Sequence, residues 1–225
     1  NARPIAELFA SQAGKFVCAS AGPNLEGIMA AKGSGAAFRS RDPIQTVLNV
    51  DIGGGTSKLA LVRDGEVLDT TAINVGGRLL AFEGDGRVVR IEPAARRIAT
   101  ELGIDLRLGE VLAVEARDRI GRALADALLE AVSRTELSTL ARELLITPPL
   151  PSDVVVDAVT FSGGVGEYIY GREERDFGDL SPFLSRRITA RIEDGALPVA
   201  SFIRWRASIR AAGNSGSRRP LRLFC

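Results

Sequence analysis

Three consecutive glycines between two apolar segments constrain the fold more than any other feature of this chain. The first segment, residues 47–52, is apolar and β-branched and carries Asp51 near its end, and the second, residues 58–62, follows shortly after Thr56. Short apolar runs bounded by glycine are typical of β-strands. Because Gly53–Gly55 have no Cβ atoms, the chain can turn tightly there. The sequence therefore predicts two neighbouring strands joined by a glycine turn.

The residues at this turn also have the chemistry of a nucleotide phosphate site. Backbone N–H groups of glycines can approach an anion, the Asp51 carboxylate can hold a magnesium ion or a water, and Thr56 offers a hydroxyl. A purely structural alternative stays open, because glycine turns join many strands and an aspartate at a strand end often caps a turn. A Walker A motif is absent, since Gly14-Lys15 is followed by Phe16 and lacks the upstream glycine.

Residue alternation predicts which side chains of the first strand share a face. Successive side chains of a strand point to opposite faces. One face therefore carries Val47, Asn49 and Asp51, and the other carries Leu48, Val50 and Ile52.

Composition limits the classes of protein and of chemistry. With 225 residues, 45% of them hydrophobic, the chain can bury a substantial core. It contains no histidine, which excludes serine–histidine and cysteine–histidine catalysis and the usual zinc sites. Two cysteines are too few for a disulfide framework and indicate a reducing compartment. No apolar run reaches the ~20 residues that a membrane helix needs, so no membrane partner is expected.

The nearly balanced charge hides an uneven distribution along the chain. After Asp194 there is no acidic residue but there are six arginines: Arg204, Arg206, Arg210, Arg218, Arg219 and Arg222. Without those six, 23 of the 29 basic residues remain against 28 acidic residues, a net charge of about −5. The body of the chain lacks the basic surface typical of nucleic-acid binding, so no nucleic-acid partner is expected.

A second strand-to-glycine turn lies about a hundred residues after the first. Residues 154–161 are interpreted as a buried strand that runs into Ser162, Gly163 and Gly164, and a helical insertion is expected over residues 92–147. Such a glycine pair either lets the backbone lie against an adenosine or serves close packing of a helix on a strand, and both interpretations stay open. Strands and helices in this order indicate an α/β fold.

Periodicity places the remaining elements. A helix is expected from Pro23 to Gly33 with an apolar stripe of Leu25, Ile28 and Met29, and a hairpin turn is expected at Asp64-Gly65. The other expected elements are helices over residues 4–13, 93–102, 110–132, 136–146 and 179–191 and strands over residues 15–19, 66–75 and 87–91.

Together these pieces resemble the actin, sugar-kinase and heat-shock-chaperone ATPase superfamily. Residues 51–56 resemble its second phosphate motif, residues 160–166 its adenosine motif, and residues 21–35 the helix that connects its two lobes. The chain is more similar still to the ethanolamine ammonia-lyase reactivating factor family, a similarity that covers residues 1 to about 203 and rests on residues 1–4, 19–23, 48–57, 74–80 and 162–167. The resemblance implies an actin-like (ribonuclease H-like) ATPase lobe with a mixed sheet and a helical insertion.

The resemblance also implies a role for each residue of the two turns. Asp51 is expected to be catalytic and to order the metal or the attacking water, with help from Thr56. The phosphates are expected at Gly53, Gly54 and Gly55, and the adenosine beside Gly163 and Gly164. These residue types suit phosphoryl transfer, where catalysis is mostly positioning and charge stabilisation.

The cofactors and the partner come from the resemblance as well. Members of the family use ATP and Mg²⁺ to exchange damaged cobalamin on ethanolamine ammonia-lyase for adenosylcobalamin, so cobalamin is handled through that partner enzyme. The resemblance implies a cytoplasmic protein, either free or associated with a bacterial microcompartment.

Both ends of the chain depart from the family pattern, and the chain is expected to be a fragment. The first phosphate loop is missing, so the two-lobed architecture is incomplete and about half of the nucleotide cleft is expected here. Residues 1–42 are expected to be the end of the first lobe with the connecting helix, 43–203 the second lobe, and 204–225 a disordered or frame-shifted tail. Within the second lobe, the glycine hairpin spans 45–75 and the adenosine-type strand and turn 154–168. ATPase activity is implied for a full-length member and stays open for this chain.

Two other functions stay open. A metabolic kinase or phosphatase of the same superfamily would need a small-substrate pocket with a dedicated base, for which Glu83, Asp85 and Asp153 are available. A binding module would keep the fold without hydrolysing nucleotide.

Overall fold

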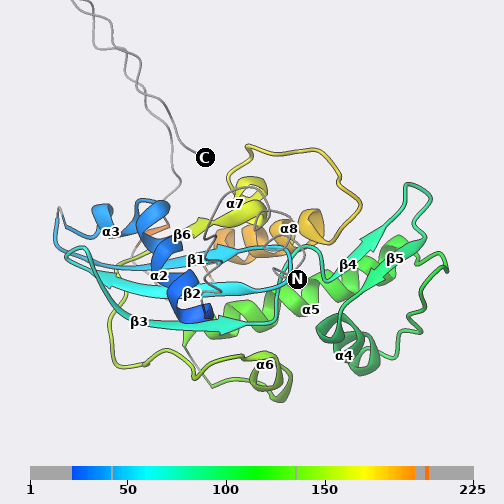
Figure 1. The fold of residues 1–225 in the computed structure, drawn as a ribbon, viewed down its shortest axis with the longest axis horizontal. Helices are drawn as coiled ribbons and strands as arrows, with labels where there is room; N and C mark the ends of the chain where they lie inside the picture. The colour runs from blue at the N-terminus through cyan, green and yellow to red at the C-terminus, as the bar shows by residue number, and fades with distance from the viewer. Residues whose placement is uncertain (1–21, 42, 135, 196–200, 203–225) are drawn as a thin grey trace, which may run out of the picture.

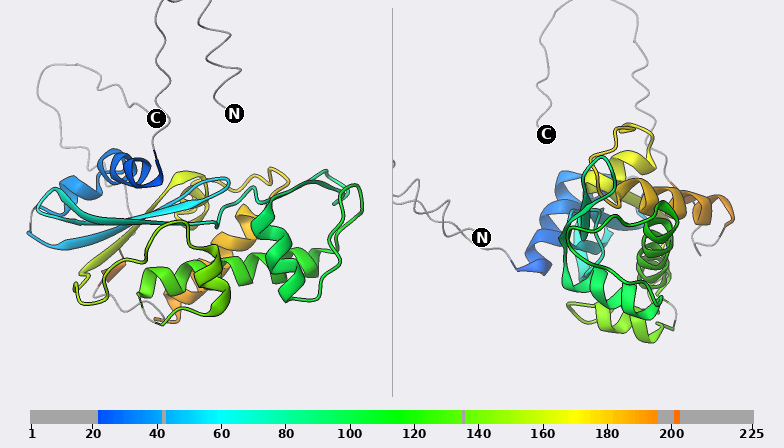
Figure 2. Two further views of the ribbon diagram at one scale, coloured as in Figure 1. Left: turned by 60° about the horizontal axis from the view of Figure 1, so that its bottom comes forward. Right: turned by 90° about the vertical axis from the view of Figure 1, so that its right-hand side faces the viewer.

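A five-stranded sheet lies between two layers of helices in the computed structural model, which describes residues 22–41, 43–134, 136–195 and 201–202 (Figure 1, Figure 2). The strand order is β3-β2-β1-β6-β7, with β1, β2 and β3 antiparallel and with β6 and β7 parallel to β1. The sheet thus combines antiparallel and parallel pairs, so the expected mixed sheet is confirmed. The strands are β1 (Thr46–Ile52), β2 (Ser57–Arg63), β3 (Glu66–Ile73), β6 (Ala158–Ser162) and β7 (Ser201–Phe202).

Both faces of β1 are buried, and they divide as the alternation predicts. Leu48, Val50 and Ile52 belong to the main hydrophobic core, which also contains the apolar side of α5 (Val114–Ser133) and part of α8 (Ser181–Glu193). These helices lie on the same side of the sheet (Figure 2). The opposite face is covered by α2 and α3, where the residues are small and the helices approach closely.

The helix α2 (Pro23–Gly33) packs its small residues on the sheet rather than its large ones. Gly27 and Ala31 are buried, whereas Leu25 is 50% and Met29 63% exposed. The prediction that the stripe of large apolar residues packs on the protein is therefore wrong. The physical reason is the close approach of α2 to the sheet, since a Cβ at Gly27 would already lie 3.5 Å from Thr70 Cγ2. The short helix α3 (Ala36–Arg39) follows and buries Ala36 and Ala37.

The helical insertion between the two glycine turns is confirmed. The two-stranded sheet of β4 (Leu80–Phe82) and β5 (Val88–Ile91) precedes it, and the expected strand at 87–91 is thus present. The insertion contains α4 (Pro93–Glu101), α5 and α6 (Thr139–Leu144). Its first helix, α4, lies with β4 and β5 beside one end of α5 (Figure 1).

Some predicted boundaries differ from the structure for local reasons. The helix α5 begins at Val114 rather than 110, and α6 begins only after Ser138, whose side chain accepts a hydrogen bond from the Ala141 N–H and caps the helix. The hairpin turn at Asp64-Gly65 is confirmed by positive φ angles of 50° and 80°. The predicted helix over 4–13, strand over 15–19 and tail over 204–225 lie outside the described residues.

The first glycine turn joins two strands, whereas the second joins a strand to a helix. The strand β6 begins at Ala158 rather than 154, and α7 (Gly163–Ile169) starts immediately after it. Among the helices that the structure describes, none combines the length and the apolar character needed to cross a membrane.

The packing of α5 on α8 generates a prediction about stability. A Cβ at Gly121 of α5 would lie 2.6 Å from Phe183 Cβ, so Gly121→Ala forces the two helices apart. We expect the free energy of unfolding to fall by about 1–3 kcal/mol, as for other overpacked cores. Gly27→Ala is the matched control, because its added methyl meets ordinary contacts and the helix gains up to about 1 kcal/mol from alanine. Urea unfolding measures the free energy of unfolding of both variants, and changes of the same sign in the two would contradict this account.

Candidate functional site

Parallel pairing of β1 with β6 brings the two glycine turns to one edge of the sheet. Asp51 is paired in register with Ser162, and the Ser162 hydroxyl donates a hydrogen bond to Asp51 Oδ1 at 2.9 Å. The two residues are 111 positions apart in the sequence. The turn at Gly53–Gly55 and the turn at Gly163 therefore leave the sheet side by side. The predicted site residues do not all face one hollow, because Gly53, Gly54 and Gly164 line one, Gly163 a second, and Gly55 and Thr56 a third.

The first turn presents backbone N–H groups to the surface. The Gly53 N–H donates to the Thr56 carbonyl oxygen at 3.1 Å, which closes the turn. Gly54 and Gly55 are exposed, and within the described residues no hydrogen bond occupies their N–H groups. Thr56 is half-buried and immediately precedes β2. Adjacent N–H groups of this kind can bind an anion such as a phosphate.

Gly163 occupies a position that only glycine can fill. Its φ is +79°, and a Cβ there would lie 2.5 Å from the Ile52 carbonyl oxygen and 3.0 Å from Asp51 Oδ1. The absence of a side chain is what allows the second turn to lie directly against the end of β1. Gly164 is different, because it is exposed and a Cβ there would meet nothing within 4 Å.

A segment whose role the sequence did not reveal supports the first turn from behind. The Gly77 N–H donates to the Gly53 carbonyl oxygen at 3.0 Å, and the Arg78 N–H donates to the Gly54 carbonyl oxygen at 2.6 Å. A Cβ at Gly76 would lie 2.4 Å from the Gly54 oxygen. This segment thus occupies the carbonyl oxygens of both Gly53 and Gly54. The signal in the sequence was the glycine pair itself, within residues 74–80.

A hollow of about 370 Å³ opens in front of the two turns. Gly53, Gly54 and Gly164 line it together with Arg78, which is exposed and supplies positive charge. Residues of α7 and of the segment that leads to α8 form the far wall, namely Val165, Glu167, Tyr168, Arg172, Glu173, Phe177, Asp179 and Ser181. A second hollow of about 410 Å³ lies on the α2–α3 side of the second turn, and Ser34, Ser162 and Tyr170 are among its lining residues.

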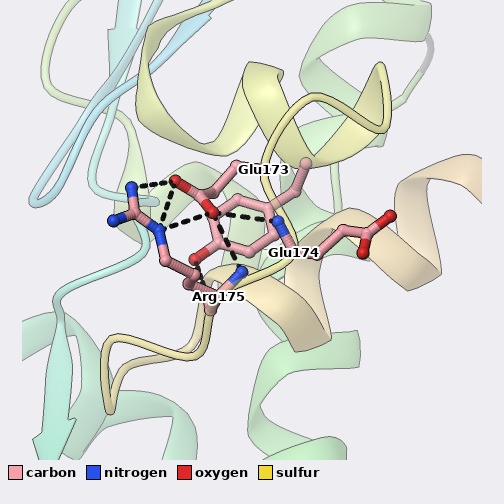
Figure 3. A network of polar contacts seen from close by, with 4 residues as sticks. Glu173, Glu174 and Arg175 are labelled. Atoms are coloured by element: carbon pink, nitrogen blue, oxygen red, sulfur yellow. Dashed lines mark hydrogen bonds and ion pairs between the residues drawn. The ribbon is translucent and has the colours of Figure 1, made fainter.

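The wall of the first hollow contains a turn built around one carboxylate. Glu173 accepts hydrogen bonds from the Glu174 and Arg175 N–H groups, and its Oε2 pairs with Arg175 Nη2 at 2.7 Å (Figure 3). The side-chain hydrogen bonds from Arg175, followed by its backbone N–H, lower the pKa of Glu173 to about 2. The Tyr168 hydroxyl donates to the Arg175 carbonyl oxygen at 2.5 Å, and partial burial raises the pKa of Tyr168. At neutral pH the turn is therefore fixed in its charged form.

The donor set at the first turn fits magnesium bound together with a phosphate. No cluster of three or more histidine, cysteine, aspartate or glutamate side chains that could hold a metal occurs in the described part of the chain. Magnesium commonly binds through one or two carboxylates, several waters and phosphate oxygens, rather than in a cage of protein ligands. Asp51 supplies one carboxylate at the end of β1 and Thr56 a hydroxyl on the other side of the glycine turn, so the residue types meet that requirement.

The strand order and the two converging glycine turns are those of an actin-like ATPase lobe. The chain belongs to the family described as ethanolamine utilisation protein EutA, whose family model matches residues 1–214.

Two curated relatives carry the name ethanolamine ammonia-lyase reactivase EutA. The protein of Salmonella typhimurium is 41% identical over 191 residues, and that of Escherichia coli is 39% identical over 191 residues. Each match covers 82% of this chain and 40% of the relative, so the chain spans less than half the length of these proteins. Among solved structures, the Ppx/GppA phosphatase of Aquifex aeolicus is 16% identical, with 66% of this chain and 34% of that chain covered and a TM-score of 0.34.

The turn around Glu173 generates a prediction about pH. The pKa of this carboxylate is depressed from 4.5 to about 2. It therefore stabilises the folded turn at pH values above 4.5, and this contribution is lost as the pH falls toward 2. We expect the Glu173 carboxyl to titrate near 2 in a ¹³C NMR experiment, and the Arg175 amide shift to follow it. Glu173→Gln should abolish this transition, whereas Glu174→Gln, which keeps Glu173, should leave it intact. A Glu173 midpoint near 4.5 would contradict the structure.

Proposed function

We propose that this chain forms the phosphate-binding and adenosine-binding half of the ATP site of an ethanolamine ammonia-lyase reactivase. In this role the protein uses ATP and Mg²⁺ to promote exchange of damaged cobalamin on the lyase for adenosylcobalamin. The protein would act in the cytoplasm or in association with a bacterial microcompartment, next to its partner enzyme. Membership of the EutA family and the names of the curated relatives support the partner and the task.

The observation that carries the ATP part of the proposal is the in-register pairing of Asp51 with Ser162. It places the Asp51 carboxylate at the same sheet edge as the unoccupied N–H groups of the first turn and the hollow lined by Gly53, Gly54 and Gly164. Each of these features is weak evidence alone, because short glycine motifs are common. Their convergence from two distant segments is what a nucleotide site requires.

In the proposed mechanism each group has a positioning or electrostatic role. The N–H groups of Gly54 and Gly55 bind phosphate oxygens, and Arg78 adds positive charge beside them. Asp51 orients a magnesium ion or the attacking water, and Thr56 contributes its hydroxyl. Magnesium, when bound, neutralises charge that develops on the phosphate oxygens. The surface at Gly163 and Gly164 lets adenosine approach the backbone.

Replacing Gly54 tests the phosphate role of the first turn. Gly54→Val adds a side chain whose Cβ has the flexible Arg78 side chain as its nearest neighbour, at 3.6 Å, so the fold should be retained while phosphate is excluded. We expect the affinity for ATP to fall at least about tenfold, the equivalent of ~1.4 kcal/mol, in the full-length protein that carries this sequence. Gly84→Val is the control, since that exposed position is equally open but lies in the turn between β4 and β5. Isothermal titration measures both affinities, and equal values would remove the turn from the site.

Replacing Asp51 tests hydrolysis and links it to the partner. Asp51→Ala should lower the magnesium-dependent ATPase rate by about 10²-fold or more, the usual loss when an electrostatic group is removed, while the protein stays folded. The same variant should fail to restore activity to lyase inactivated by damaged cobalamin. Retained ATP binding with no turnover in the unaltered protein would instead support the binding-module alternative. Turnover of a small phosphate acceptor without lyase would support the kinase alternative.

A further inference from the structure

A chain of side-chain hydrogen bonds leads from Asp51, along the face of the sheet that α2 and α3 cover, to the junction of these two helices. We call it the Asn49 network, and it comprises Ser34, Asn49, Asp51, Thr160 and Ser162. The Ser162 hydroxyl donates to Asp51 Oδ1 at 2.9 Å and accepts from Asn49 Nδ2 at 3.2 Å. The Ser34 and Thr160 hydroxyls each donate to Asn49 Oδ1 at 3.0 Å.

The direction of these hydrogen bonds is fixed by elementary donor and acceptor rules. A serine hydroxyl has one proton, and a carboxylate only accepts. If the Asn49 amide were reversed, its oxygen would need the Ser162 proton, and two acceptors would then face each other 2.9 Å apart at Asp51. With the amide as it stands, Asn49 donates to Ser162 and leaves the serine proton to Asp51.

The network therefore occupies one oxygen of the Asp51 carboxylate, and within the described residues no hydrogen bond or ion pair holds the other. Asn49 is completely buried, so its amide is held by packing as well as by three hydrogen bonds. Gly163 completes the arrangement, because a Cβ there would lie only 3.0 Å from Asp51 Oδ1.

We infer that Ser162, with its hydroxyl oriented by Asn49, is the positioning residue that fixes the Asp51 carboxylate for a magnesium ion or a water. Ser162 and Asn49 act through Asp51 and do not themselves touch the nucleotide. The inference rests on the proposed function for the identity of the ligand. The network itself is a property of the chain without any ligand.

The first experiment tests the network in the absence of nucleotide and metal. The side-chain NH₂ resonance of Asn49, assigned by its loss in Asn49→Asp, should move and exchange with solvent about tenfold faster in Ser162→Ala, since a hydrogen bond within a charged network contributes ~1.5 kcal/mol. Ser162→Thr keeps the hydroxyl and should restore the resonance. An unchanged Asn49 resonance in Ser162→Ala would overturn the network.

The second experiment measures whether Ser162 acts through Asp51. The magnesium-dependent part of ATP affinity is the ratio of affinities with Mg²⁺ and with EDTA, measured by titration in the full-length protein. We expect Ser162→Ala to reduce this ratio about tenfold while the affinity in EDTA stays the same. In the Asp51→Ala background, Ser162→Ala should cause no additional loss. Ser185→Ala, another serine that is buried but bonds only to its own helix at Pro182, is the control.

The outcomes separate the inference from the proposed function. If Asp51→Ala reduces the ratio and Ser162→Ala does not, the positioning role is overturned and the proposed function stands. If Ser162→Ala causes a further loss in the Asp51→Ala background, Ser162 acts on its own and the inference is equally overturned. If Asp51→Ala leaves the ratio unchanged, the proposed magnesium role of Asp51 fails, whatever the Asn49 resonance shows.

Discussion

The parallel pairing of β1 with β6 is the constraint on which the rest of the site depends. Each strand end carries part of the chemistry, and neither part is useful alone. Parallel strands end at the same edge of a sheet, and ligands of α/β proteins commonly bind there. Here the register matters as much as the direction, because Asp51 faces Ser162 only when Val47 is paired with Ala158. A shift of one residue would turn the Ser162 side chain to the other face.

The sequence predicted what is local and failed where packing between distant segments decides. The glycine turn, both faces of β1 and the Asp64-Gly65 hairpin were predictable because each depends on a few adjacent residues. The buried face of α2 was not, because the close approach of the sheet favours Gly27 over the larger Leu25. The site residues could be proposed one by one, but the partnership of Asp51 and Ser162 could not, because it depends on the strand register.

The glycine turn is also more constrained than its composition suggests. Gly76, Gly77 and Arg78 occupy the carbonyl side of the turn, and the Ser57 hydroxyl donates to the Val75 carbonyl oxygen at 2.7 Å. The turn is therefore held through its carbonyl oxygens by its own chain, while no hydrogen bond among the described residues occupies the N–H groups of Gly54 and Gly55. A preorganised set of donors needs no rearrangement when an anion binds, which is the arrangement that electrostatic stabilisation requires.

Stability alone does not explain why the central strand carries an asparagine. Burying an amide is unfavourable unless its hydrogen bonds are made. Even a full set of hydrogen bonds only compensates for the hydrogen bonds to water that the amide loses on folding. An apolar residue would serve the packing of this face as well, as Val47 does two residues earlier. The distinctive effect of Asn49 is directional, because it decides where the proton of Ser162 points. That direction is transmitted to Asp51, the carboxylate two residues before the first glycine turn.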